Sequence, residues 1–151
     1  MIMNIQSEVY GTEYIESESS LKSKVFLSPE TCFVLVDNVE VVGYFISLPV
    51  RQGCFPLLNE VSGDAYTKTR NIHIHDMVIT RSFSGNGYYR CFLEAFYQSL
   101  SALSYLTVSI VSVPQAIGFW RYLGFRRCQR STYDLGGYGS DSSYMTLEVV
   151  Q

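Results

Sequence analysis

Residues 72–96 carry the strongest structural signal in the chain and read IHIHDMVITRSFSGNGYYRCFLEAF. The apolar, β-branched run that ends at Ile79 predicts a strand over residues 71–79, and a small glycine-containing turn follows at 82–87. Beyond the turn, large apolar residues recur at spacings of three and four, which predicts a helix over 87–104 with one buried face. The turn leaves backbone N–H groups unpaired at the helix start, where the helix dipole also favours an anionic group.

The elements on either side of this stretch complete a mixed sheet. A short helix over 114–123 ends at Gly124, a residue that commonly ends helices. Short helices within 14–26 end at Ser28-Pro29, because the residue before proline resists helix. Strands are predicted at 31–36 and 39–48, which form a hairpin, and at 106–111, 125–133 and 143–150. This order predicts one α/β domain, residues 1–151, with a twisted mixed sheet flanked by helices.

Composition excludes several classes of protein. The net charge is −3 and no basic run exceeds Arg126-Arg127, so we expect no nucleic-acid partner. No apolar stretch is long enough to span a bilayer and the first residues lack the pattern of a signal peptide, so we expect no membrane partner and a cytoplasmic location. Four cysteines are widely spaced without a metal-binding pattern, which predicts reduced thiols and no metal: Cys32, Cys54, Cys91 and Cys128.

A second informative stretch spans residues 113–125 and reads VPQAIGFWRYLGF. Together the two stretches, about 30 residues apart, resemble the two best-known motifs of the GNAT acetyltransferase superfamily. Residues 74–89 align with L-H-D-L-A-V-x-P-x-x-R-G-x-G-x-G/A, and residues 113–125 align with N-x-x-A-x-x-F-Y-x-x-x-G-F. The strand containing Val41-Val42-Gly43-Tyr44 is similar to the family's strand before the donor site. Pro49 and Pro56-Leu57-Leu58-Asn59 are similar to a bacterial branch with an F-W-x-x-x-G-F motif.

The resemblance, which covers residues 31–150, implies the GNAT fold and a site for acetyl-coenzyme A. It implies that the backbone of Met77, Val78 and Ile79 holds the pantetheine arm where the strand splays from its neighbour. It places the pyrophosphate on the turn at Ser84, Gly85, Asn86, Gly87, Tyr88 and Tyr89, and the donor beside Phe119 and Trp120. The implied reaction is direct transfer of an acetyl group, in a ternary complex, to a primary amine of an unidentified small molecule or peptide.

Three positions depart from the family pattern. Ser84 stands where the family has Arg or Gln, and Tyr89 where it has a small residue. We therefore expect weaker coenzyme A binding than in typical members, because a charge-assisted contact is lost. Trp120 stands at the usual tyrosine acid, and an indole N–H cannot donate a proton at neutral pH. Tyr122 lies about 200° around the helix from Trp120, so we expect water to protonate the leaving thiolate.

His73 and His75 are the only histidines in the chain. Strand alternation places them on one face with Met77 and Ile79, and Asp76 on the opposite face as a structural residue. A similar H-x-H pair acts as base or proton relay in arylalkylamine N-acetyltransferases. By that resemblance His75 is the first candidate for the catalytic base and His73 the second, while simple packing of both rings is the alternative.

The acceptor site and the role of the chain stay open at this level. An acidic rim that attracts an amine is one interpretation, and an ordinary solvated surface the other, for Glu13, Glu16, Glu18, Asp64, Asp134 and Asp141. Tyr133, Tyr138 and Tyr144 are candidates to line the pocket. A degenerate domain that binds acyl-coenzyme A as a sensor, or a plain interaction domain, are the alternative functions. Because superfamily members often dimerise, a homodimer also stays open.

Overall fold

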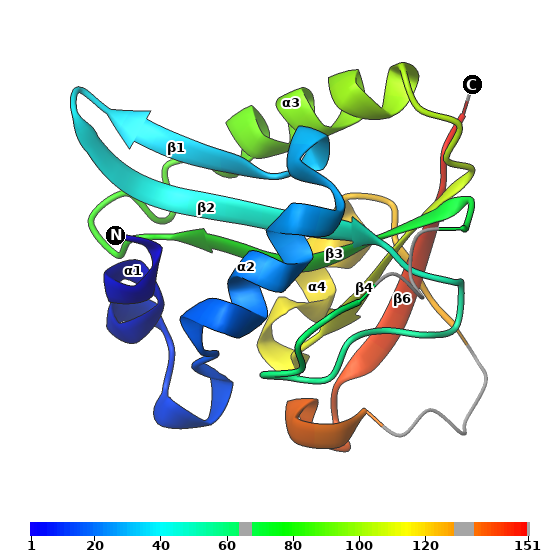
Figure 1. The fold of residues 1–151 in the computed structure, drawn as a ribbon, viewed down its shortest axis with the longest axis horizontal. Helices are drawn as coiled ribbons and strands as arrows, with labels where there is room; N and C mark the ends of the chain where they lie inside the picture. The colour runs from blue at the N-terminus through cyan, green and yellow to red at the C-terminus, as the bar shows by residue number, and fades with distance from the viewer. Residues whose placement is uncertain (64–67, 129–134, 151) are drawn as a thin grey trace.

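The computed structural model describes residues 1–63, 68–128 and 135–150 and contains a mixed six-stranded sheet with helices on both faces (Figure 1). The strand order is β1-β2-β3-β4-β6-β5. The strands are β1 (Phe33–Asp37), β2 (Glu40–Pro49), β3 (Asn71–Ile79), β4 (Thr107–Ser112), β5 (Arg126–Arg127) and β6 (Ser143–Glu148). This architecture confirms the predicted mixed α/β fold.

The β1–β2 hairpin forms one edge of the sheet, and β2 then pairs antiparallel with β3. Asn38 takes a positive φ of 53° in the tight turn, a conformation that asparagine tolerates well. Gly43 is required for close approach, because a Cβ atom there would lie 2.7 Å from the Val78 carbonyl oxygen. The hairpin thus places β2, which is buried from Val42 onward, alongside β3.

Helix α3 (Tyr89–Ser101) connects β3 to β4, which run parallel. Parallel neighbours need such a crossover because a short turn cannot reverse the chain twice. The helix buries Phe92, Phe96 and Leu100 against the sheet, as its spacing predicted. The structure therefore places the glycine turn that precedes α3 beside the far end of β3.

The C-terminal third adds a short helix and the second edge of the sheet. Turn η4 (Pro114–Ala116) leads into α4 (Ile117–Tyr122), and Gly124 follows with a φ of +98°. Strand β5 is described for two residues only; the predicted strand over 125–133 runs into residues 129–134, which lie outside the described part of the chain. Turn η5 (Gly136–Tyr138) precedes β6, which pairs with both β4 and β5.

The N-terminal segment covers the other face of the sheet. It contains α1 (Ile2–Val9), which the sequence pattern did not predict, followed by η1 (Thr12–Tyr14), α2 (Glu18–Leu27) and η2 (Pro29–Thr31). Helix α2 begins at Ser17, whose side chain accepts a hydrogen bond from the Ser20 amide, and ends before Ser28-Pro29 as expected. In the described part of the chain, no helix has the length and apolar character needed to cross a membrane.

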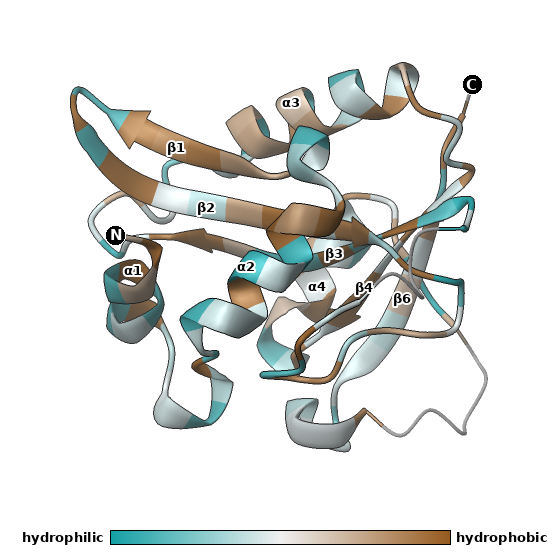
Figure 2. Ribbon diagram, in the orientation of Figure 1, coloured by the Kyte–Doolittle hydropathy of each residue, from teal (hydrophilic) through white to brown (hydrophobic). Residues whose placement is uncertain are grey.

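Two apolar clusters pack on opposite faces of the sheet. Residues such as Phe45, Ile72 and Ile74 pack with α3 and α4, whereas Tyr44, Ile46 and Val78 pack with α1 and α2. Figure 2 shows apolar residues along most of β1 and β2, and both polar and apolar residues along α2. Each of the central strands therefore buries both of its faces.

A β-bulge at His75 changes the predicted facing of β3. Ile46 pairs with Asp76 but its neighbour Ser47 pairs with Ile74, so His75 is the extra residue. Beyond the bulge, Asp76 and Val78 face α1 and α2, whereas Met77 packs with the α3 cluster. The prediction that Asp76 lies on the face opposite the histidines, and Met77 and Ile79 on theirs, is therefore wrong, because strict alternation does not survive a bulge.

Candidate active site

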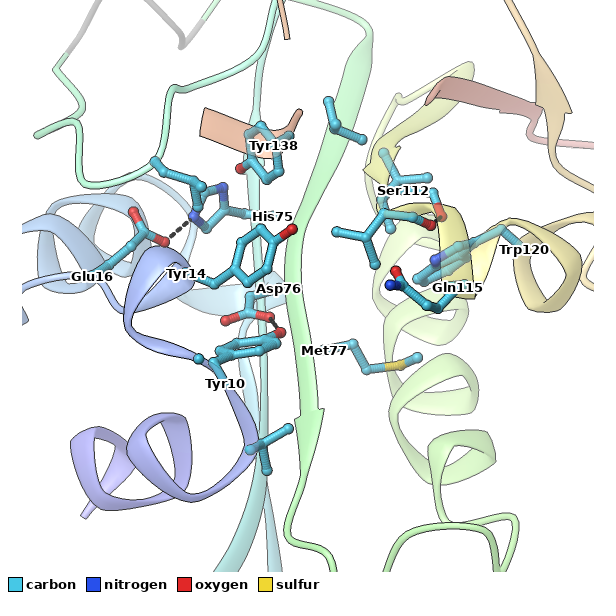
Figure 3. Close-up of a pocket in the computed structure, with 17 residues that line it drawn as sticks. Tyr10, Tyr14, Glu16, His75, Asp76, Met77, Ser112, Gln115, Trp120 and Tyr138 are labelled. Atoms are coloured by element: carbon cyan, nitrogen blue, oxygen red, sulfur yellow. Dashed lines mark hydrogen bonds and ion pairs between the residues drawn. The ribbon is translucent and has the colours of Figure 1, made fainter. Parts of the chain in front are cut away.

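The sheet opens between β3 and β4. The two strands pair only from Asn71 with Thr107 to Ile74 with Ile110, and beyond Ile74 strand β3 pairs with β2 alone. A cavity of about 320 Å³, here named the cleft cavity, occupies this opening (Figure 3). On one side, the cleft cavity is bordered by Tyr10, Tyr14, Glu16, His75 and Asp76. On the other side, it is bordered by Met77, Ser112, Gln115 and Trp120.

A second cavity, here named the turn cavity, lies along the open end of β3 and measures about 420 Å³. Val9, Tyr10 and Met77 line both cavities, which places the two cavities side by side. The turn cavity also collects most of the predicted donor-binding residues, namely Met77, Val78, Ile79, Ser84, Gly85, Gly87, Tyr88, Tyr89 and Phe119. Trp120 lines the cleft cavity instead, and Asn86 is exposed and lines neither.

The glycine turn presents free backbone donors to the turn cavity. Gly85 and Gly87 have φ angles of +79° and +80°, which residues with a side chain rarely adopt. Within the described chain the amides of residues 85–89 donate no hydrogen bond, whereas the Ser84 amide is already bonded to the Thr80 carbonyl at 2.9 Å. Free amides at a helix start attract anions, so five of the six predicted positions keep a backbone donor for a phosphate group.

His75 is held by a buried carboxylate from the N-terminal segment. Its Nε2 lies 2.5 Å from Glu16 Oε2, and the two side chains are 1% and 2% exposed. Glu16 in turn accepts from the Ser20 hydroxyl and the Asn59 amide and pairs with Lys24 at 3.2 Å. Burial alone would raise the pKa of Glu16, but His75, Lys24 and the Asn59 amide lower it to about 2.

These contacts fix the tautomer of His75. Glu16 is ionised near neutral pH and can only accept, so the neutral imidazole must carry its hydrogen on Nε2. Its Nδ1 then has a free lone pair, and this buried atom makes no hydrogen bond within the described residues. His75 also lines the cleft cavity, so a residue with an unsatisfied ring nitrogen forms part of the wall of the opening.

His73 occupies a different environment from His75. It is 1% exposed, its Nδ1 lies 2.9 Å from the Ser109 hydroxyl, and its ring stacks between Phe55 and Tyr144. Burial, with a smaller contribution from His75, lowers the pKa of His73 to about 3. It lines neither cavity, so the structure does not bring the two predicted histidines to one reaction space.

Asp76 forms a buried network with two tyrosines. The Tyr10 hydroxyl donates to Oδ1, and the Tyr44 hydroxyl donates to Oδ2 at 2.7 Å. Burial raises the pKa of Asp76, although the two hydroxyl donors oppose this. Burial and the nearby Asp76 carboxylate likewise raise the pKa of Tyr10 and Tyr44. Figure 3 shows Asp76 and Tyr10 meeting on the same side of the cleft as His75.

A family model, described as the acetyltransferase (GNAT) family, matches residues 1–125. The chain belongs to the GNAT family. A search of curated proteins gives no match, but solved GNAT structures share the fold over nearly the whole chain.

Three of these structures illustrate the likeness. The loading GNATL domain of CurA from Lyngbya majuscula has a TM-score of 0.74 at 9% identity, covering 96% of this chain and 89% of that one. Ard1 from Thermoplasma volcanium has a TM-score of 0.71 at 15% identity, covering 99% and 89%. The GphF GNAT-like decarboxylase in complex with isobutyryl-CoA has a TM-score of 0.69 at 12% identity, covering 96% and 91%.

The departures from the GNAT motifs have clear structural settings. Trp120 is 4% exposed and packs edge-on against Phe119 and Phe125. Tyr122 is 75% exposed and lines neither cavity, which agrees with its predicted direction. The Tyr89 ring packs edge-on against Phe119 at 5.0 Å between ring centroids, and the two rings together form one wall of the turn cavity.

The cleft cavity contains residues that the sequence pattern missed or whose place it left open. The sequence predicts either an acidic rim or an ordinary solvated surface that includes Glu16, but Glu16 is 2% exposed. Asp64 and Asp134 of the same set, like Tyr133, lie outside the described residues. Tyr138 borders the cleft cavity, whereas Tyr144 packs on His73. Apart from their aromatic character, nothing in the sequence around Tyr10 and Tyr14 predicts that they line this cavity. Among the described residues, no group of three or more His, Cys, Asp or Glu is arranged to hold a metal ion.

Proposed function

We propose that the chain is an acetyl-CoA-dependent N-acetyltransferase that acts on a primary amine by direct transfer within a ternary complex. The observation that carries this proposal is the pair of adjoining cavities along the open half of β3. The turn cavity is lined by the glycine turn with its unpaired amides, and the cleft cavity is lined by His75, whose Nδ1 makes no hydrogen bond within the described residues. Residues 1–151 would work as one catalytic domain, since the N-terminal helices, the sheet and α4 all contribute to these cavities.

The residues around the turn cavity fit acetyl-CoA. Free amides at residues 85–89 would bind the diphosphate, and the unpaired edge of Met77 to Ile79 would bind the amides of the pantetheine arm. Because backbone donors do not depend on side-chain identity, Ser84 can replace arginine, with a loss of roughly 1.5–3 kcal/mol of binding free energy. When bound, the thioester supplies an activated acyl group and a thiol leaving group.

His75 would serve as the general base through Nδ1. An amine must lose a proton to become an amide, and His75, whose Nδ1 keeps a free lone pair, lines the cavity where the acceptor would lie. Glu16 would act as a positioning residue, because its carboxylate holds the Nε2 proton and stabilises the imidazolium that forms. His73 is less suited to this role, since its low pKa and enclosed ring favour packing.

No side chain of α4 needs to protonate the leaving thiolate. The Trp120 indole cannot give up its proton, and the exposed Tyr122 ring lines neither cavity. A thiol has an ordinary pKa of about 8.5, so the thiolate leaves without obligatory protonation. Water reaching the turn cavity would protonate the thiolate after it leaves.

Two measurements on the full chain test the proposal. Acetyl-CoA at ten times its Kd should stabilise the protein by about 1.4 kcal/mol, which raises Tm by about 3–6 °C for a domain of this size. Thiol release should then depend on added amine. Binding without thiol release from any amine would indicate the acyl-CoA sensor, and absence of a thermal shift at millimolar acetyl-CoA would indicate an interaction domain.

A further inference from the structure

The carboxyl group of Asp76 is buried in the wall of the cleft cavity without a lysine or arginine partner among the described residues. Its residue is 9% exposed, and both of its oxygens accept hydrogen bonds from neutral tyrosine hydroxyls. No lysine or arginine of the described chain forms an ion pair with it. An isolated buried carboxylate is costly unless a positive charge approaches it.

Glu16, the other buried acid of the cleft, differs from Asp76 in this respect. Glu16 has the buried ammonium of Lys24 at 3.2 Å and the His75 ring at 2.5 Å. Its oxygens are therefore committed within the protein. A carboxylate offers about four acceptor positions, of which the tyrosines use two on Asp76. Asp76 thus keeps acceptor capacity in the wall of the cleft cavity.

The rest of the cavity suits a small cation with an apolar body. Tyr10, Tyr14, Tyr138 and Trp120 line it, and aromatic faces attract ammonium groups. Its volume of about 320 Å³ is near the lower end of the ~300–1,000 Å³ typical of small-molecule sites. The unpartnered Nδ1 of the buried His75 is an independent sign that a ligand with a polar hydrogen belongs in this space.

We propose that Asp76 binds the ammonium group of the acceptor, and that the acceptor is a small primary alkylamine or arylalkylamine with an apolar body rather than a peptide. The role of the amine as acetyl acceptor rests on the proposed function, but binding of the amine to Asp76 does not depend on turnover. Asp76 would be the specificity-determining residue, while the tyrosine rings enclose the apolar body of the amine.

Titration calorimetry on the full chain, saturated with coenzyme A, tests the binding with benzylamine and its neutral analogue benzyl alcohol as probes. Benzylamine should bind at least roughly 10-fold tighter than the alcohol to the unmodified protein, as expected for a hydrogen bond to a charged group. Asp76→Asn should weaken benzylamine roughly 10- to 100-fold and leave the alcohol unchanged. Equal affinities for the two probes in the unmodified protein would overturn the proposal even if the variant fails to fold.

A thiol-release assay with acetyl-CoA separates this inference from the proposed function. Faster release with benzylamine than with an unblocked tetrapeptide is expected, and the reverse order would overturn the substrate class while leaving acetyl transfer intact. Asp76-dependent binding of benzylamine without thiol release from any amine would instead refute the transferase and keep the ammonium site. Tyr122→Phe, which changes an exposed residue outside both cavities, is the matched control.

Discussion

The two halves of β3 differ although they belong to one continuous strand. In the paired half, residues 72–74 pair with β2 on one side and β4 on the other; in the open half, residues 75–79 have no partner on β4, and all but the bulged His75 pair with β2. The first half is fully enclosed, with Ile72 and Ile74 at 0% exposure, and the second half lines two cavities. The fold therefore uses one half of the strand for stability and leaves backbone groups of the other half free for ligands.

The largest effect is expected for a substitution of His75, the first residue of the open half of β3. His75→Gln keeps a donor for Glu16 but removes the proton acceptor, so kcat should fall by about 10²–10⁴, the usual contribution of a general base. The Kd for acetyl-CoA, measured by calorimetry, should stay unchanged. Tyr122→Phe serves as the control, and near-normal turnover of the glutamine variant would remove His75 from the proposed chemistry.

The next prediction contrasts a residue of each half. Ile74→Ala removes a fully buried side chain from the paired half and should lower the free energy of unfolding by about 2–5 kcal/mol, because a cavity remains. Met77→Ala on the open half should cost less stability, since Met77 borders both cavities, and should instead weaken acetyl-CoA binding. Urea denaturation and calorimetry measure the two effects, and equal losses of stability would contradict the contrast.

A pH measurement sharpens the comparison at His73 in the paired half. Burial lowers its pKa to about 3, so between that value and the ordinary histidine pKa near 6.5 only the unfolded chain binds the proton. The free energy of unfolding should therefore fall as the pH drops from 6.5, by up to about 1.4 kcal/mol per pH unit for this group. His73→Gln should remove this part of the slope in urea titrations at pH 7, 6 and 5. An unchanged slope would show that His73 is not buried in its neutral form.

The smallest effect is expected for a substitution within the glycine turn that follows the open half of β3. Gly85→Ala adds a methyl group in open space but at a φ of +79°, a strain of about 1 kcal/mol that the turn would relieve by moving its amides. Acetyl-CoA binding should weaken up to roughly 10-fold. Gly118→Ala, also in open space but without a positive φ, is the matched control. Identical affinities of the two variants would argue against the amide cradle.

Local pattern was enough to predict most of the fold. The bounds of β3 match the predicted range, and β2, α3 and β4 differ from it by one to three residues at each end, because hydrophobic period and glycine or proline signals act over a few residues. Helix α1 was missed although Ile2, Ile5 and Val9 have helical spacing. Its eight residues carry no capping signal at Met1 and no acidic first turn.

The candidate site was only partly predictable. The glycine turn and the order of the two motifs predict the proposed donor side. The proposed acceptor side depends on the bulge at His75, which moves Asp76 to the face of the histidines, and on contacts such as Glu16 with His75 across 59 positions of the chain. Neither a bulge nor a contact between residues far apart in the sequence produces a periodic pattern. A buried acid such as Glu16 therefore cannot be distinguished by sequence from an exposed one.

Val9 and Tyr10 line both cavities, and this sharing has a consequence for the order in which ligands bind. A molecule in either cavity restricts the same two side chains at the end of α1, so a second molecule loses less conformational entropy when it enters. Such coupling is reciprocal. The donor and the acceptor should therefore each increase the affinity of the protein for the other, and deletion of α1 should abolish that cooperativity.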